Sequence, residues 1–226
     1  MRAILTAASF YTAWTRCRPS EGPLPGSTIT GLRTALDIPC RLTTSLSLAA
    51  RFRGPGGSMS AQTYAYGEGL RMFYDGEVLG ETIYSAMLAG ADDSVERLKL
   101  SHLLQLETET KAWLRPHLMS AGVCVVEPPA VREQGLAIAQ AQPPAWADKM
   151  KGLADIIEAE FATLYRRYGD AARSRGRADE AAVCDFMYDH EMAQVEFARR
   201  DLAGEPLERV LEPLRRHSNH LLPLTP

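Results

Sequence analysis

Four stretches of the chain repeat apolar residues every three or four positions, which is the period of a helix with one buried face. They cover residues 64–91, 94–120, 146–173 and 178–203. A further apolar group, Leu207, Val210, Leu211 and Leu214, has the same spacing near the end of the chain. The pattern therefore predicts four long amphipathic helices and a short C-terminal helix that packs back on them.

Two of the breaks between these stretches are short and one is long. The short breaks are 92–93, in the sequence GADD (90–93), where Asp92 or Asp93 can cap the next helix, and 174–177 (SRGR). The long break, 121–145, contains two Pro-Pro pairs and only a short alanine-rich piece, so we interpret it as a connection. Tight turns make consecutive helices antiparallel neighbours. The chain is therefore predicted to be all-α, an antiparallel four-helix bundle with one long crossover between its second and third helices.

The first 58 residues differ in charge from the rest. They hold seven arginines, no lysine and two acidic residues, whereas residues 59–226 hold 18 basic and 26 acidic residues. No helical or strand period is sustained in them. Three interpretations stay open: a transit-like leader, a disordered extension, or upstream sequence translated from a misassigned start, with Met59 as the initiator. The bundle is then expected within 59–216, followed by a frayed tail, 217–226.

The overall composition excludes several classes of protein. The formal net charge is −3, so the strongly basic surface typical of nucleic-acid binders is not expected. No apolar stretch reaches the length of a membrane-spanning helix. The four cysteines form no C-x-x-C motif, and a cytoplasmic, reducing location is the expectation.

Glutamates occupy the apolar faces of all four predicted helices, where an unpaired carboxylate is costly to bury. They are Glu77 and Glu81 in the first helix, Glu107 in the second, Glu160 in the third and Glu191 in the fourth. Glu77 and Glu107 are about equally far along the chain from the first tight turn, as are Glu160 and Glu191 from the second. Because antiparallel helices rise equally per residue, one glutamate from each helix is predicted to meet in a layer at mid-bundle. Glu81, one turn nearer its loop, is the alternative in the first helix.

This constellation resembles the ferritin-like superfamily, which includes rubrerythrins and di-iron carboxylate oxidases. The resemblance rests on residues 76–84 (GEVLGETIY), 106–110 (LETET) and 190–198 (HEMAQVEFA). The family's di-iron site takes a glutamate from two helices and a Glu-x-x-His motif from each of the other two. Here the matching motifs end in Thr110 and Gln194, so both histidines are replaced.

Two functional hypotheses follow from this resemblance and from the replacement of both histidines. In the first, the glutamates bind iron or manganese in a metal-dependent oxidoreductase, and His190, Gln194, Thr110 and Tyr84 orient them. In the second, the core is polar but metal-free, and the bundle is a binding or assembly module. His190 is expected to project about 100° away from Glu191, as neighbours on a helix do. His217 is expected at the surface. The resemblance to the ferritin-like superfamily also implies a homodimer.

Overall fold

The computed structural model describes residues 66–221, with only the backbone described at 219–221, and this part of the chain is all-helical. The interpretations of residues 1–58, and residues 222–226 of the predicted tail, lie outside it. The helices are α3 (Tyr66–Ala89), α4 (Ser94–Ser120), α5 (Pro129–Ala141), α6 (Trp146–Ile156), the π-helix η1 (Ile157–Phe161), α7 (Ala162–Arg173), α8 (Ala178–Leu202) and α9 (Leu207–Leu221).

The helix ends follow local chemistry that the sequence carries. Asp93 is the N-cap of α4, and its carboxylate accepts from the backbone N–H groups of Val95 at 2.9 Å and Glu96 at 2.8 Å. Gly176, in the turn between α7 and α8, has a φ of 67°, a conformation that favours glycine. Pro116 does not shorten α4, which continues to Ser120.

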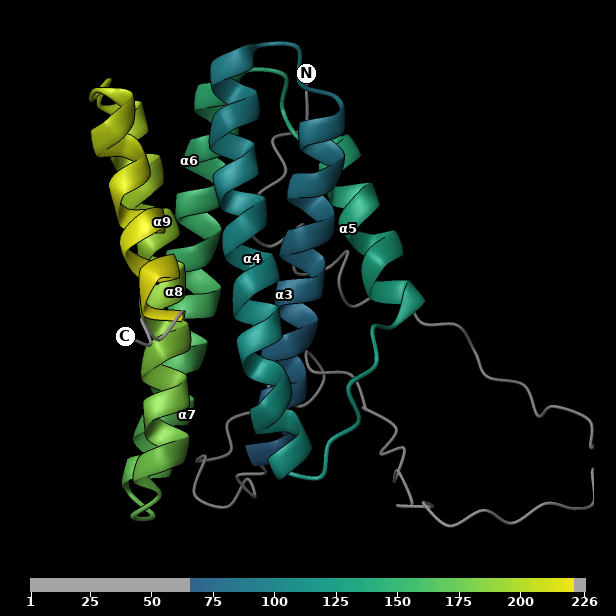
Figure 1. Ribbon diagram of the computed structural model, residues 1–226, viewed down its shortest axis with the longest axis vertical. Coiled ribbons are helices and arrows are strands. Elements are labelled where there is room, and N and C mark those ends of the chain that lie inside the picture. The colour runs from purple at the N-terminus through teal and green to yellow at the C-terminus, as the bar shows by residue number, and fades with distance from the viewer. Residues whose placement is uncertain (1–65, 222–226) are drawn as a thin grey trace, which may run out of the picture.

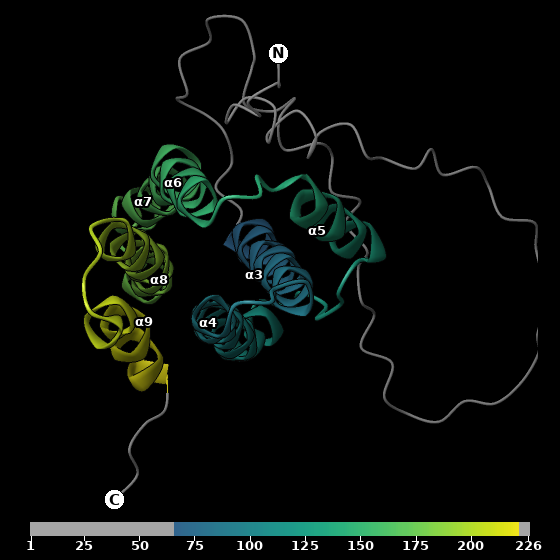
Figure 2. The same cartoon turned by 90° about the horizontal axis from the view of Figure 1, so that it is seen from above.

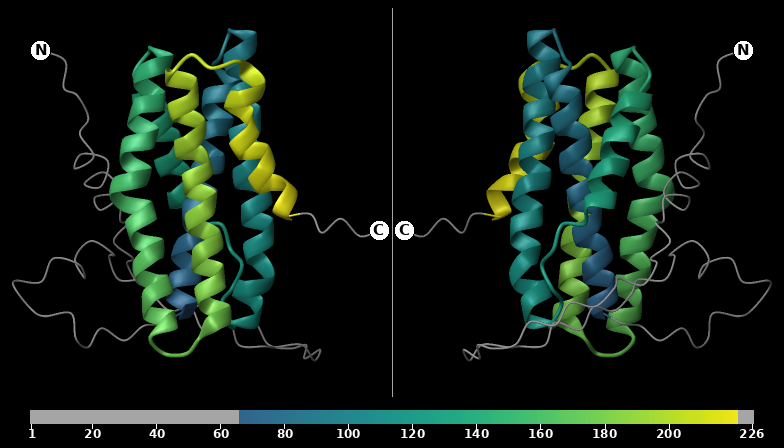
Figure 3. Two further views of the ribbon diagram at one scale, coloured as in Figure 1. Left: turned by 90° about the vertical axis from the view of Figure 1, so that its left-hand side faces the viewer. Right: turned by 90° about the vertical axis from the view of Figure 1, so that its right-hand side faces the viewer.

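The helices form two antiparallel hairpins. In the first, α3 packs against α4, and in the second, the continuous unit α6–η1–α7 packs against α8 (Figure 1). Seen from above, α6–α7, α8 and α9 lie in a row beside α3 and α4 (Figure 2). Side views show that α3 and α8 run in one direction and α4 and α6–α7 in the other (Figure 3).

Two elements differ from the sequence-based expectation. The long break was interpreted as a connection, but it contains α5, a 13-residue helix that packs against α3. The C-terminal helix α9 packs against α8 and α4 and continues to Leu221, past the expected start of a frayed tail at residue 217.

The core consists of two apolar clusters at different heights. One contains Leu103, Leu106, Ile157 and Val195, and the other contains Leu70, Leu114 and Met187, among others. Phe161 of η1 packs against both clusters. Along α3, α4 and α8, buried polar residues fall between the two clusters, so the fold places a polar layer inside an apolar core.

Candidate metal centre

The polar layer draws its side chains from three helices. Each of them is buried, with at most 7% of its surface exposed. They are Glu77 of α3, Glu107 and Thr110 of α4, and His190, Glu191 and Gln194 of α8. The apolar clusters above and below separate this layer from solvent.

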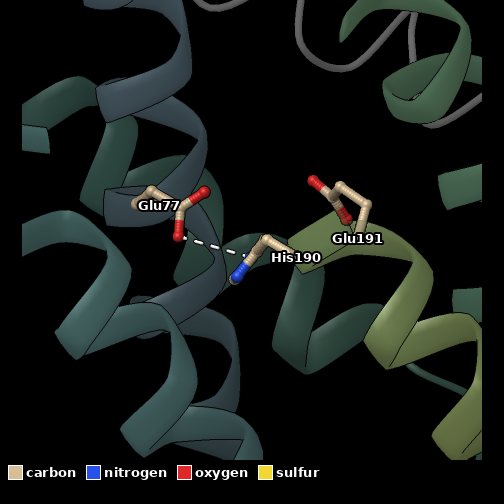
Figure 4. A group of neighbouring side chains, drawn as sticks. All are labelled: Glu77, His190 and Glu191. Atoms are coloured by element: carbon tan, nitrogen blue, oxygen red, sulfur yellow. Dashed lines mark ion pairs between the residues drawn. The ribbon is translucent and has the colours of Figure 1, made fainter. Parts of the chain in front are cut away.

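His190 lies at the centre of the layer. Its Nε2 is 3.4 Å from Oε2 of Glu77 and 3.4 Å from Oε1 of Glu107. Glu77, His190 and Glu191 each offer one ligand atom, and these atoms lie within 4.8 Å of one another. Figure 4 shows Glu77 directed from α3 toward His190, with Glu191 on the next position of α8. Among the described residues, this is the one group of three or more side chains with metal-binding geometry.

A hydrogen-bond network orients these groups. Tyr84 donates to Oε1 of Gln194 at 2.6 Å, and Nε2 of Gln194 donates to Oε1 of Glu107 at 2.7 Å. The Thr110 hydroxyl lies 3.0 Å from Nδ1 of His190. Thr110 and Gln194 thus act as hydrogen-bond partners inside the layer.

The same contacts favour one tautomer of His190. Nε2 of Gln194, a donor, lies 3.0 Å from Nε2 of His190, which accepts only if its proton is on Nδ1. Nδ1–H then donates to Thr110. In this neutral form Nε2 carries no proton, as in a metal-ligating histidine held by its other ring nitrogen. Protonation of Nε2 would instead let the ring donate to Glu107.

Two of the carboxylates, those of Glu77 and Glu191, are destabilised as anions. Burial, and then the charges of Glu107 and Glu191 and a hydrogen bond with Glu107, raise the pKa of Glu77 well above its ordinary value. Burial raises the pKa of Glu191 to about 8, although His190 and a hydrogen bond from Tyr165 oppose the shift. Oε2 of Glu77 has no hydrogen-bond partner among the described residues. The layer therefore requires protons or a bound cation to balance its charge.

Gly80 provides the space for one of these carboxylates. It stands on α3 opposite Glu107, and a Cβ added there would overlap the Glu107 carboxylate. A glycine inside a helix is unfavourable by about 0.5–1 kcal/mol relative to alanine. Its presence here is explained by the carboxylate that approaches the helix backbone.

Three of the five predicted glutamates, Glu77, Glu107 and Glu191, meet in the layer as expected from their heights. Glu81 does not. Its carboxylate lies 2.5 Å from Nζ of Lys111 and 2.9 Å from the Thr108 hydroxyl, in an ion network that also includes Arg132 and Glu127. This network lies where α5 covers α3, outside the group around His190.

Glu160 is half-buried and is not part of the group with metal-binding geometry. The reason is η1. Glu160 was expected on the inward face of the third helix, but the wider π turn places Ile157, Ala162 and Tyr165 at the buried positions. Tyr165 thereby faces the layer and hydrogen-bonds Glu191. Tyr165, a large aromatic residue, is the sequence signal for this inward-facing position that the prediction missed.

His190 and Glu191, neighbours on α8, both reach the core, because α8 is buried on more than one side. The expected surface position of His217 is wrong. His217 is not a surface residue but 7% exposed, and its ring packs on Phe186 at 4.6 Å and on His190 at 5.6 Å between centroids. Trp113 of α4 continues this row of rings by packing on Phe186.

In the described part of the chain, every helix is too short or too polar to cross a membrane. Comparisons with known protein families, with curated proteins and with solved structures found no match.

Proposed function

We propose that the protein is a divergent ferritin-like protein whose core binds one divalent transition-metal ion through Glu77, His190 and Glu191. A single observation carries the proposal. Two carboxylates and one imidazole, all buried, bring their ligand atoms within 4.8 Å of one another. Two hairpins joined by a long connection support the ferritin-like part, because that connectivity occurs in ferritin-like bundles.

The residues present fit a metal ion. Imidazole with carboxylates suits manganese, iron or zinc. Oε2 of Glu77 is buried without a hydrogen-bond partner among the described residues, and Oε1 of Glu107 also lies 3.4 Å from Nε2 of His190. Gly80 leaves room for the Glu107 carboxylate, so the layer is shaped for charged groups.

The donor set favours one ion over two. A di-iron or di-manganese site of the family draws on four glutamates and two histidines. Here Glu81 is engaged by Lys111 and Glu160 lies outside the group. Three or four donors remain, which is sufficient for a mononuclear site that keeps a position open.

In this proposal the chain itself holds and orients the donors. Thr110 fixes the ring of His190, and Tyr84 fixes Gln194, which in turn holds Glu107. A bound ion would supply Lewis-acid or one-electron redox chemistry. A metal-dependent oxidoreductase is thus the enzyme hypothesis, and oxygen consumption by the iron- or manganese-loaded protein tests it. The homodimer implied by the resemblance stays a prediction.

The test is the metal content of the purified full chain after supply of manganese, iron or zinc. We expect one equivalent of metal in the wild type and its loss when Glu77→Gln and Glu191→Gln are combined. Glu81→Gln and Glu160→Gln are matched controls, since each makes the same chemical change in a glutamate outside the group. Metal retained in the double variant, or lost equally in the controls, would contradict the site.

One observation favours a second candidate, a metal-free polar core in a binding or assembly module. Glu77 has a raised pKa and a hydrogen bond with Glu107, so one proton held between them would balance part of the charge. Gln194, Tyr84 and Thr110 already supply further hydrogen bonds. In this case the folded wild type contains no metal, and the double glutamine variant is at least as stable as the wild type.

A further inference from the structure

A row of aromatic rings runs from the candidate metal centre toward the surface. The ring of His190 contacts the ring of His217 with 5.6 Å between centroids, and His217 contacts Phe186 at 4.6 Å. Phe186 contacts Trp113 at 3.8 Å, and Trp113 contacts His117 at 4.5 Å. The rings come from α8, α9 and α4, so the row exists only in the folded protein. We refer to these five residues as the ring row.

The ring row joins two different environments. At its inner end, His190 has 0% of its surface exposed and is a proposed ligand of the metal ion, and His217 is 7% exposed. At its outer end, Phe186, Trp113 and His117 are only half-buried. The row therefore leads from a proposed ligand in the core to a pair of rings, those of Trp113 and His117, that solvent reaches.

An electron carrier cannot reach the candidate metal centre directly. The three proposed ligands are buried, and apolar clusters lie above and below them. An electron exchanged with another protein must therefore cross the side chains that lie between. The rate of such a crossing falls steeply with the width of each gap between bonded groups, so a series of rings in contact is the favoured route.

A second series of rings lacks a direct connection to the metal centre. Tyr165, which hydrogen-bonds Glu191, packs on Phe73 at 4.8 Å, and Phe73 packs on Tyr168 at 5.5 Å. None of these three rings belongs to a proposed ligand, so the series meets the centre only through a hydrogen bond. In the ring row, by contrast, the first ring is the proposed ligand His190.

We propose that the ring row carries single electrons to the metal centre from a redox protein that docks over Trp113 and His117. The inference rests on the proposed function, since it requires a redox-active ion bound to His190. The partner is a one-electron carrier with a reduced flavin or iron–sulfur group. Electron-transfer partners bury little surface, so the area around two half-buried rings is sufficient for docking.

The electron balance is simple. The carrier is oxidised by one electron, and the bound ion is reduced by one, from the ferric to the ferrous state when iron is present. No bond forms or breaks. The rings of the row are not themselves reduced, because the electron crosses them by tunnelling.

The test is the reduction of the full chain, loaded with ferric iron, by reduced methyl viologen, a charged dye that the apolar clusters exclude. Stopped-flow spectroscopy follows the loss of the dye's colour, one dye molecule for each ferric ion reduced. We expect Trp113→Leu to bind as much iron as the wild type and to be reduced at least about tenfold more slowly. Zinc-loaded protein should leave the dye reduced, because zinc has no redox chemistry.

Two half-buried aromatic residues outside the ring row provide matched controls. Trp146→Leu, on α6, and Tyr168→Leu, in the second series of rings, are expected to leave the rate of reduction unchanged. Trp113→Phe keeps a ring in place and should retain the wild-type rate within about threefold. Circular dichroism and iron content establish that each variant is folded and loaded. If Trp113→Leu does not fold, Phe186→Leu, which removes the next ring of the row, takes its place.

The outcomes separate this inference from the proposed function. A folded wild type that binds no iron would overturn both. Normal iron content in Trp113→Leu, combined with reduction at the wild-type rate, would overturn the ring row alone. Slower reduction of Tyr168→Leu than of Trp113→Leu would also overturn it, and would assign the route to Tyr165, Phe73 and Tyr168.

Discussion

Nε2 of His190 and Oε2 of Glu77 lie 3.4 Å apart across the boundary between the two helical hairpins. Glu77 belongs to α3 and His190 to α8, so this contact joins halves of the molecule that are far apart in sequence. Apolar clusters lie on both sides of it. The candidate metal centre therefore lies at the interface on which the packing of the two hairpins depends, and changes there affect both stability and metal binding.

The hydroxyl of Thr110 should control the orientation of His190. Thr110→Val keeps the shape of the side chain but removes the partner of Nδ1, which leaves that nitrogen buried and unpaired. We expect metal affinity to fall about 10- to 100-fold, and the free energy of unfolding to fall by about 1–3 kcal/mol. Competition titration with a metal chelator and urea denaturation measure the two effects.

Thr108→Val is the matched control for that change. Thr108 is on the same helix but exposed, and its hydroxyl contacts Glu81 in the ion network around Lys111. Its loss should change metal affinity and stability little. If Thr110→Val and Thr108→Val changed metal affinity and stability equally, Thr110 would have no special role in holding the imidazole of His190.

Gly80→Ala should be destabilising, although the same change inside a helix usually stabilises. The new methyl group would overlap the Glu107 carboxylate, so we expect a loss of about 1–3 kcal/mol in the free energy of unfolding. In Gly152→Ala, on α6, the added methyl group meets open space, so the free energy of unfolding should rise by up to about 1 kcal/mol. Urea denaturation of both variants gives the comparison, and a stabilised Gly80→Ala would show that the carboxylate does not occupy this position.

The sequence was sufficient to predict the helices whose signals are local. The second predicted helix, 94–120, has the bounds of α4, because an N-cap aspartate begins it and a glycine follows its end. Equal offsets from the tight turns placed Glu77, Glu107 and Glu191 at one height, because the rise of a helix is the same everywhere. These predictions depended on chain distance alone.

The failures have a different origin, since they depend on tertiary packing. A single π turn shifted the inward face of the third helix and removed Glu160 from the layer. Spacing alone could not place His190 in the layer beside Glu191, because α8 has no single buried face. His217 became buried because α9 covers α8 and α4. None of these features has a periodic signature in its own segment.

His217→Ala should destabilise the protein without abolishing metal binding. The side chain packs against Phe186 and His190, so its removal leaves a cavity at the edge of the layer. We expect the free energy of unfolding to fall by about 2–4 kcal/mol and metal affinity to change less than tenfold. His102→Ala, in a less buried histidine of α4, should cost less than about 1 kcal/mol. Complete loss of bound metal in folded His217→Ala would instead make His217 a ligand.

The metal-free protein should lose stability as the pH rises from 5 to 8. The pKa of Glu191 is about 8 in the folded chain, above its ordinary value of 4.5, so the folded state retains a proton that the unfolded state releases. That stabilisation is complete below about pH 4.5 and is lost as the pH rises through 8. Glu77 shifts in the same direction. For each such group, the free energy of unfolding falls by up to about 1.4 kcal/mol for every unit by which the pH rises in this window.

His190 adds to this trend. Burial lowers its pKa, but hydrogen bonding and the charges of Glu107 and Glu191 outweigh burial and raise the pKa overall. Its contribution is therefore also present at low pH and lost as the pH rises. Glu127, whose pKa is lowered to about 2, is ionised in both states above pH 5 and leaves the slope unchanged in this window.

Thermal unfolding at several pH values, with and without metal, checks the prediction. Glu191→Gln should flatten the profile of the metal-free protein, because it removes the group that titrates near 8. Bound metal should reverse the slope, since it competes with protons for the same atoms and binds more tightly as they leave. A profile that is flat without metal and identical in Glu191→Gln would mean that the Glu191 carboxylate is already ionised in the folded protein, and that no cation is needed to balance it.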